Sequence, residues 1–265
     1  MENIRSHFFT TLGIIWGLVQ LFLGLMILIV FTLWGVSVAF LRPSLKTKFY
    51  IATLFWEPAC HLIIRVGLLT RPFKIDRRSP QFKSNTALAL YISNHKSIFD
   101  IPLILTVYQI VPVMKKELMR VPLFGLIAKA STAIPVDRKD KVSRIKVVKE
   151  VQKRLKAGLP IQFYPEGTRS KTDKPKNFDD VKTTLISIAY KENIPVIPSA
   201  VWGTDKITNS FGITQFPVKL GIIVQEELYP KDFTDEESFC RACWEKVLAA
   251  YQEMDQHFSE VQPTL

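Results

Sequence analysis

The sequence predicts an α/β domain with a largely parallel central sheet flanked by helices, preceded by an N-terminal membrane-embedded helical segment. From residue 71 onward, short apolar runs alternate with amphipathic helical stretches, a pattern typical of parallel sheets with helices on their faces. Before residue 42, a long stretch carries no charge. We therefore divide the 265 residues into a membrane-anchoring segment, 1–70, and a folded domain, 71–265.

The uncharged stretch covers residues 8–41, which contain no Asp, Glu, Lys or Arg. A helix needs about 20 apolar residues to cross a bilayer, so this stretch is long enough to cross it or to embed in one leaflet. A second apolar stretch, 49–70, carries Glu57, His61 and Arg65 at helical spacing, and Pro58 predicts a helix start or kink there. A charged stripe is typical of helices that lie at an interface or pack on protein, so we expect a helical hairpin.

The flanking charges predict an orientation. Only Glu2 and Arg5 precede the long apolar stretch, whereas seven basic residues follow the apolar region: Arg42, Lys46, Lys48, Arg71, Lys74, Arg77 and Arg78. The positive-inside bias places the folded domain on the cytoplasmic face, at the inner membrane of a bacterium or the endoplasmic reticulum of a eukaryote. The formal charge of +11 then fits anionic membrane lipids as partners, and we expect no nucleic-acid partner.

The expected elements alternate along the folded domain. The predicted strands are 86–92, 110–114, 160–164, 195–201 and 218–224, and the predicted helices are 100–107, 122–130, 141–157, 180–192 and 234–257. The helix at 141–157 has a regular apolar face and ends at Gly158. Its basic residues are interpreted as a solvated face: Lys146, Lys149, Lys153, Arg154 and Lys156.

Cysteine and histidine are too sparse for a disulfide framework or a histidine-based metal site. Cys60, Cys240 and Cys243 are the only cysteines, and the last two fall on one face of a predicted helix. An isolated pair supplies too few ligands for a structural metal site. We expect no metal and no tightly bound cofactor.

A histidine and an aspartate follow the strand at 86–92. His95 falls in the turn that leaves the strand, and Asp100 falls in the first turn of the next helix, with Ser97 as its expected capping residue. A carboxylate in that position can accept from one imidazole nitrogen and leave the other as a general base. His95 and Asp100 are therefore the candidate catalytic pair.

A second polar turn follows the strand at 160–164. It contains Glu166, Gly167, Thr168 and Arg169, which combine a permissive glycine, a hydroxyl and a guanidinium that matches phosphate oxygens. This composition suits a phosphate head group, although a plain surface turn has the same composition.

These sites resemble the glycerolipid acyltransferase superfamily, especially its 1-acylglycerol-3-phosphate acyltransferases. The resemblance covers about residues 85–205 in four blocks in order. The blocks are Asn94-His95-Lys96-Ser97-Ile98-Phe99-Asp100; Lys116-Glu117-Leu118 with Pro122, Gly125 and Val136-Asp137-Arg138; Pro165-Glu166-Gly167-Thr168-Arg169-Ser170; and Ile194-Pro195-Val196-Ile197-Pro198 with Gly203.

The resemblance implies that 71–265 is an acyltransferase catalytic domain. It implies transfer of a fatty acyl group from acyl-coenzyme A or acyl carrier protein, as co-substrate, to the hydroxyl of 1-acyl-glycerol 3-phosphate, giving phosphatidic acid. In that family the histidine is the base and the aspartate orients it. The residues that bind the acceptor phosphate map onto Glu166, Gly167, Thr168, Arg169 and Arg138, with Lys116 as a further candidate.

The chain also departs from the family pattern. Tyr164 stands where the turn usually opens with Phe, and Lys182-Thr183-Thr184 stands where a glycine commonly follows Phe-Lys. A customary glycine before Val136 is also missing. These departures leave the acceptor open: another lysophospholipid or glycerol 3-phosphate is an alternative. A thioesterase or an inactive lipid-binding membrane protein is a further alternative.

Overall fold

The structure is a computed structural model, and the continuous parts that it describes begin at residue 44. They are residues 44–83, 88–121, 132–137, 139–170, 172–208 and 218–260, with isolated positions between 18 and 37 and at 125 and 128. The stretch predicted to embed in a membrane, 8–41, therefore lies outside the described residues apart from those isolated positions. Within the described part, no helix combines the length and the apolarity that crossing a membrane requires.

A mostly parallel sheet forms the centre of the described part, as the sequence predicts. Its seven strands lie in the order β1-β7-β6-β2-β5-β3-β4. The strands are β1 (Phe73–Asp76), β2 (Leu90–Ser93), β3 (Val111–Lys115), β4 (Ile134–Val136), β5 (Ile161–Phe163), β6 (Val196–Trp202) and β7 (Gly221–Val224). The run from β4 to β6 is parallel throughout, whereas β7 pairs antiparallel with β6 and parallel with β1.

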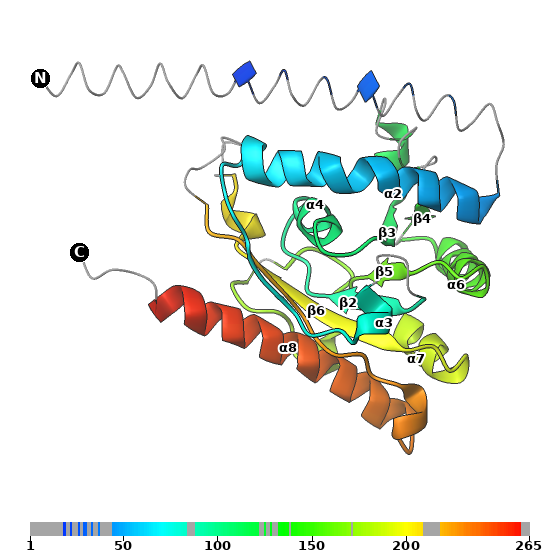
Figure 1. The fold of residues 1–265 in the computed structure, drawn as a ribbon. Coiled ribbons are helices and arrows are strands. Elements are labelled where there is room, and N and C mark those ends of the chain that lie inside the picture. Colours follow the sequence, from blue (N-terminus) through cyan, green and yellow to red (C-terminus); the bar gives the residue numbers. More distant parts are fainter. Residues whose placement is uncertain are drawn as a thin grey trace, which may run out of the picture.

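Helices cover both faces of this sheet (Figure 1), with α2 and α4 on one side and α7 and α8 on the other. The α-helices are α2 (Leu45–Leu62), α3 (Pro80–Lys83), α4 (Asp100–Leu105), α6 (Lys141–Lys156), α7 (Thr184–Lys191) and α8 (Glu236–Glu260). A π-helical turn spans Ile63–Gly67, and 3-10 turns are η2 (Lys116–Arg120), η3 (Phe178–Asp180), η4 (Thr204–Lys206) and η5 (Pro230–Asp232).

Two apolar cores lie on the two faces of the sheet. One contains Trp244 and Val247 of α8, and the other contains Leu103 and Ile104 of α4. Every residue of β2, β6 and β7 is buried, because helices cover the strands from both sides. Full burial on both faces explains why these strands read as nearly continuous apolar runs.

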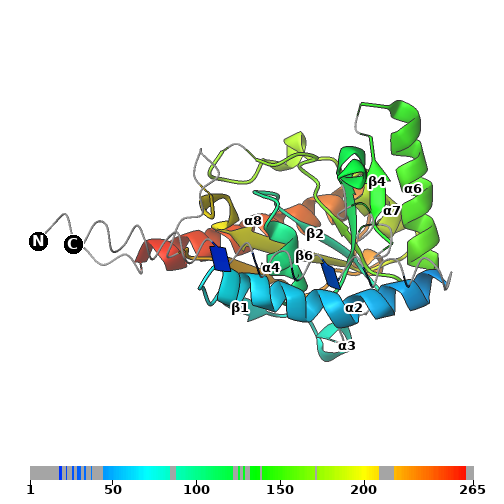
Figure 2. The same ribbon diagram turned by 90° about the horizontal axis from the view of Figure 1, so that it is seen from above.

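Helix α2 corrects part of the expectation for residues 49–70. It begins at Leu45, where the Ser44 hydroxyl accepts from the Thr47 amide at 3.1 Å, and it runs through Pro58 without starting there. Phe49 and Cys60 are buried, so this helix packs on protein, as its charged stripe indicates. Figure 2 shows α2 lying across the domain from the α6 side.

Several other boundaries differ from the expectation. β1 and β4, the two outermost strands, are absent from the predicted list because each is a short edge strand whose apolar run is interrupted by an exposed residue. α7 begins at Thr184, since the preceding residues form η3 and a short extended link. Of the expected helix at 122–130, only Gly125 and Ala128 are described, and both are helical.

The basic face of α6 is also smaller than expected. Lys146, Lys149, Lys153 and Lys156 are exposed, but Arg154 is buried. The Arg154 side chain donates to the Thr132 carbonyl at 2.9 Å and pairs with Glu150. Arg154 thus fixes the loop before β4 and does not belong to a solvated face.

Candidate active site

Three neighbouring parallel strands deliver the candidate residues to one edge of the sheet. β2 lies between β5 and β6, with Ile92 opposite Phe163 and Ser93 opposite Ser199. Their carboxyl ends therefore share an edge, which is where ligands bind in open α/β sheets. His95 follows β2, the turn at 164–169 follows β5, and Thr204 follows β6.

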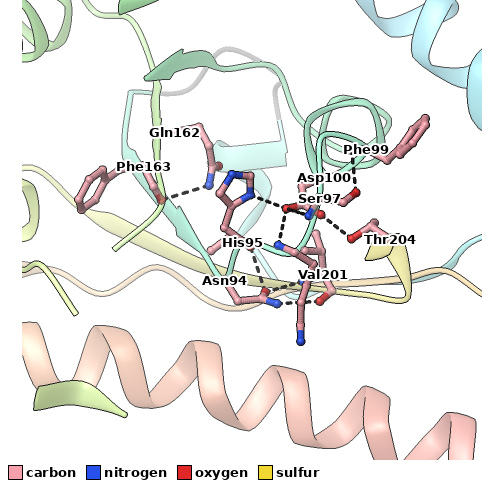
Figure 3. Close-up of polar contacts among 11 residues, drawn as sticks. Asn94, His95, Ser97, Phe99, Asp100, Gln162, Phe163, Val201 and Thr204 are labelled. Carbon is pink, nitrogen blue, oxygen red and sulfur yellow. Dashed lines mark hydrogen bonds and ion pairs between the residues drawn. The ribbon is translucent and has the colours of Figure 1, made fainter. Parts of the chain in front are cut away.

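His95 and Asp100 form the pair that the sequence predicts (Figure 3). His95 Nδ1 lies 2.7 Å from Asp100 Oδ2. The same oxygen accepts from the amides of Lys96 and Ser97 at 2.8 and 3.1 Å, and Oδ1 accepts from the Thr204 hydroxyl at 2.5 Å. The two amides can only donate, and the Thr204 hydroxyl donates here, so the Asp100 carboxyl group acts as an acceptor. The hydrogen on the His95–Asp100 contact therefore belongs to Nδ1.

Part of the His95 side chain is accessible at the surface. The His95 side chain is 15% exposed, whereas the Asp100 side chain is fully buried. No described residue hydrogen-bonds to Nε2. With its proton on Nδ1, the ring has a free lone pair on Nε2, as a general base requires.

Hydrogen bonds to β6 fix the backbone of the loop that carries His95 (the histidine loop, residues 94–99). The Asn94 side-chain amide donates to the Val201 carbonyl at 2.9 Å, and its oxygen accepts from the Val201 amide at 2.8 Å. Asn94 thus pairs with β6 as another strand residue would. Ser97 differs from the expectation: its hydroxyl accepts from the Phe99 amide at 3.0 Å, and the cap position of α4 is Phe99.

The second turn is joined directly to the histidine loop. The Ser170 amide donates to the His95 carbonyl at 2.7 Å. Gly167 has a φ of +69°, which an L-residue adopts only with strain, and its amide donates to the Tyr164 carbonyl at 3.0 Å. Thr168 and Arg169 are exposed, and the Ser170 bond places the turn that carries them next to the histidine loop.

Glu166 behaves differently from the rest of this turn. It is 2% exposed, and its Oε1 accepts from the Lys176 amide at 3.3 Å. Oε2 has no hydrogen-bond partner among the described residues. Burial raises the pKa of the Glu166 carboxyl group, against the opposing effects of the Lys176 amide and the charge of Lys96. Its side chain therefore faces the interior of the turn.

The two remaining predicted residues fall at the ends of β3 and β4. Lys116 begins η2 directly after β3 and is exposed. Strands lie about 4.8 Å apart, so β3, two strands from β2, carries Lys116 at the same edge about 10 Å to the side. Arg138 lies outside the described residues, two positions after the end of β4.

Four side chains around the pair were not predicted as site residues. Tyr164 stacks on the His95 ring, with 4.2 Å between centroids, and Thr204 binds Asp100. Lys182 lies over the turn, with Nζ 3.1 Å from where a Cβ on Gly167 would stand, and Lys96 is buried beneath the loop. Thr204 is 104 residues from Asp100, so no local spacing reveals it.

Other reactive groups of the described part lie away from this pair. All three cysteines are buried and free, and burial raises the pKa of Cys60 to about 12 and also raises the pKa of Cys240. No cluster of three His, Cys, Asp or Glu side chains suited to a metal ion occurs in the described ranges. A cavity of about 450 Å³ lies between η3, α7 and α8, and none of its lining residues is a predicted site residue.

Known proteins share this domain. The family model described as Acyltransferase matches residues 74–202. A 1-acyl-sn-glycerol-3-phosphate acyltransferase of Brassica napus is 31% identical over 149 residues, which are 55% of this chain and 42% of that protein. A protein of the same name from Salmonella typhimurium is 26% identical over 202 residues, covering 72% of this chain and 78% of the relative.

A solved structure has the same fold. The crystal structure of PlsC, the 1-acyl-sn-glycerophosphate acyltransferase of Thermotoga maritima, superimposes with a TM-score of 0.70 at 23% identity. The match covers 96% of this chain and 98% of that one. The chain thus spans about two-fifths of the Brassica protein but nearly all of the Thermotoga structure. Residues 74–202, which include His95 and Asp100, are thus similar to the acyltransferase family.

Proposed function

We propose that the protein is a 1-acylglycerol-3-phosphate O-acyltransferase, which acylates lysophosphatidic acid to phosphatidic acid. The observation that carries this proposal is the His95–Asp100 pair, with Nδ1 and Oδ2 2.7 Å apart and Nε2 free of hydrogen bonds to the described residues. The pair lies next to the turn at residues 164–169 (the arginine turn), in which Arg169 is exposed. The names of the Brassica and Salmonella relatives support the same acceptor.

In the proposed reaction, His95 is the general base. Nε2 takes the proton of the acceptor hydroxyl as its oxygen attacks the thioester carbonyl carbon. The tetrahedral intermediate then expels the thiolate, which takes the proton back from the imidazolium, so that an ester and a thiol form. Asp100 stabilises the imidazolium through the 2.7 Å contact, and base assistance of this kind is worth about 10²–10⁴ in rate.

The turn after β5 is proposed to bind the acceptor phosphate. Arg169 offers paired N–H donors that match phosphate oxygens, and Thr168 offers a hydroxyl. The hydrogen bond from the Ser170 amide to the His95 carbonyl, at 2.7 Å, holds this turn next to the loop that carries the proposed base. Arg138 and Lys116 are proposed as further cations, since β4 and β3 end at the same edge of the sheet.

The acyl donor and the membrane attachment belong to the same proposal. Acyl-coenzyme A or acyl carrier protein would supply the thioester, and no metal or further cofactor takes part. Residues 8–41 would anchor the protein in or across the membrane where the lysolipid resides, with the domain on the cytoplasmic face. Only the head group of the acceptor then has to reach the edge of the sheet where the site lies.

A comparison of acceptors tests this proposal. Purified protein in detergent is given acyl-coenzyme A or acyl carrier protein loaded with the same chain, and thiol release and ester product are followed. We expect lysophosphatidic acid to be the preferred acceptor over lysophosphatidylcholine and glycerol 3-phosphate. A preference for either alternative would reassign the acceptor. Thiol release without any acceptor would indicate a thioesterase, and no release with any pair would indicate a lipid-binding protein.

A further inference from the structure

Lys96, the residue after the candidate base, is buried at 5% exposure. Its ammonium group donates to the Thr172 carbonyl at 2.6 Å and also to the Asp173 carbonyl. Both carbonyls belong to the loop that continues from the arginine turn, and both residues are exposed. A charged side chain of the histidine loop thus holds the main chain of the second loop.

The same loop is also attached to α8. The Tyr251 hydroxyl donates to the Asp173 carbonyl, and the Trp244 indole donates to the Lys176 carbonyl at 2.9 Å. Lys96 Nζ lies 5.4 Å from the centre of the Tyr251 ring. The segment 172–176 is therefore held between the histidine loop on one side and the C-terminal helix on the other.

Burying the Lys96 ammonium group has a desolvation cost. Burial lowers the pKa of Lys96, because desolvation outweighs the surrounding charges of Asp205, Glu166, Asp173 and Asp100. No carboxylate of the described residues forms an ion pair with its ammonium group within 4.0 Å. This desolvation cost offsets part of the stability that the hydrogen bonds to the Thr172 and Asp173 carbonyls contribute. These contacts therefore bear on where the loop lies as well as on stability.

We propose that Lys96 is a positioning residue that holds the arginine turn at a fixed position relative to His95. Two sets of hydrogen bonds join the loops. The Ser170 amide donates to the His95 carbonyl, and the Lys96 ammonium group donates to the carbonyls of Thr172 and Asp173. With both in place, the guanidinium of Arg169 and the Nε2 of His95 keep a fixed separation. This inference rests on the proposed function, because the acceptor phosphate is what Arg169 would bind.

The test is Lys96→Met, which keeps the length of the side chain and removes its donors. We expect the KM for lysophosphatidic acid to rise about tenfold, the kcat to change less than about threefold, and the thermal midpoint to change little, because the relieved desolvation cost offsets the lost hydrogen bonds. Lys96→Arg, which retains a cation and N–H donors, should recover most of the affinity. Lys174→Met, in the same loop but with an exposed side chain, is the matched control and should leave the KM within about twofold.

Amide hydrogen exchange supplies a readout that does not depend on the substrate. In Lys96→Met the amides of Ser170 and Lys176, which bond to His95 and Glu166, should exchange at least several-fold faster than in the wild type. Unchanged exchange and unchanged KM, or a fall in thermal midpoint that accounts for all lost activity, would overturn the positioning role. A wild-type enzyme inactive on lysophosphatidic acid would refute the proposed function alone, and the exchange rates would still decide on Lys96.

Discussion

The imidazole of His95 lies nearly parallel to the ring of Tyr164, with 4.2 Å between the centroids and 18° between the planes. The hydrogen bond from Nδ1 to Asp100 fixes one edge of the imidazole, and the stack on Tyr164 fixes one face. These two contacts fix the orientation of the ring and leave Nε2 without a hydrogen bond to the described residues. Tyr164 occupies the place where the family usually has Phe, and its hydroxyl is buried without a hydrogen-bond partner among the described residues.

Tyr164→Phe removes this unpartnered hydroxyl and retains the stack. A buried polar group without a partner costs about 1–3 kcal/mol, so we expect the free energy of unfolding to rise by about 1 kcal/mol. The kcat should stay within about twofold. Urea unfolding in detergent, together with steady-state rates, measures both. A loss of stability would show that the hydroxyl has a partner after all, and Tyr164→Ala serves as the comparison that removes the stack.

Thr204→Val removes the donor to Asp100 Oδ1 while keeping the shape of the side chain. Since Thr204 is 1% exposed, water cannot easily replace the lost 2.5 Å bond. We expect a loss of about 1–3 kcal/mol of stability and about a tenfold lower kcat. Thr204→Ser keeps the hydroxyl and should retain wild-type rates within about threefold. Equal losses in both variants would mean that packing of the methyl group matters, and not the bond to Asp100.

Gly167→Ala places a Cβ 3.1 Å from Lys182 Nζ at a φ of +69°. The left-handed backbone alone costs an L-residue about 1–2 kcal/mol, and the lysine must also move. Gly158→Ala is the matched control, because its φ is +75° but no atom lies within 4 Å of the added Cβ. We expect similar losses of stability in the two variants. Only Gly167→Ala should raise the KM for the acceptor, and an equal rise in both would contradict the placement of Lys182 over the turn.

Glu166→Gln should change how stability depends on pH. Burial raises the pKa of the Glu166 carboxyl group in the folded protein, so the folded state holds its proton to higher pH than the unfolded chain does. Ionisation of this group therefore destabilises the fold increasingly as pH rises above the unfolded pKa of about 4.5. We expect Glu166→Gln to be more stable than the wild type at pH 8, with the difference shrinking toward pH 5.

Unfolding curves at several pH values measure this difference. Glu245→Gln, an exposed position on α8, controls for the loss of one negative charge and should show no such trend. A difference between Glu166→Gln and the wild type that is the same at every pH would mean that folding does not raise the pKa of this carboxyl group.

The sheet is well predicted by the sequence where burial is complete. β2 and β6 read as apolar runs because both of their faces are covered. β1 and β4 escape detection because they are short edge strands, in which Lys74 and Pro135 are exposed. The antiparallel pairing of β7 with β6 depends on the path of the chain between them, and no local pattern encodes it.

The candidate site also has one part that the sequence predicts and one part that only the fold reveals. His95 and Asp100 are five residues apart, so their pairing is written into one loop and is predicted from spacing and family resemblance. Thr204 and Lys96 act through contacts 104 and 76 residues away, which only the fold brings together. Glu166 shows the limit of a family pattern, since the pattern locates the residue but does not reveal that its carboxyl group is buried.

The most direct test of the account is the rate of acyl transfer to lysophosphatidic acid by His95→Ala at saturating donor and acceptor. We expect the kcat to fall about 10²–10⁴-fold, with the thermal midpoint unchanged. The matched control is His257→Ala, whose ring stacks on Phe73 and takes no part in the site, and it should keep its activity. If His95→Ala retains more than about a tenth of the wild-type kcat, His95 is not the base and the proposed mechanism is wrong.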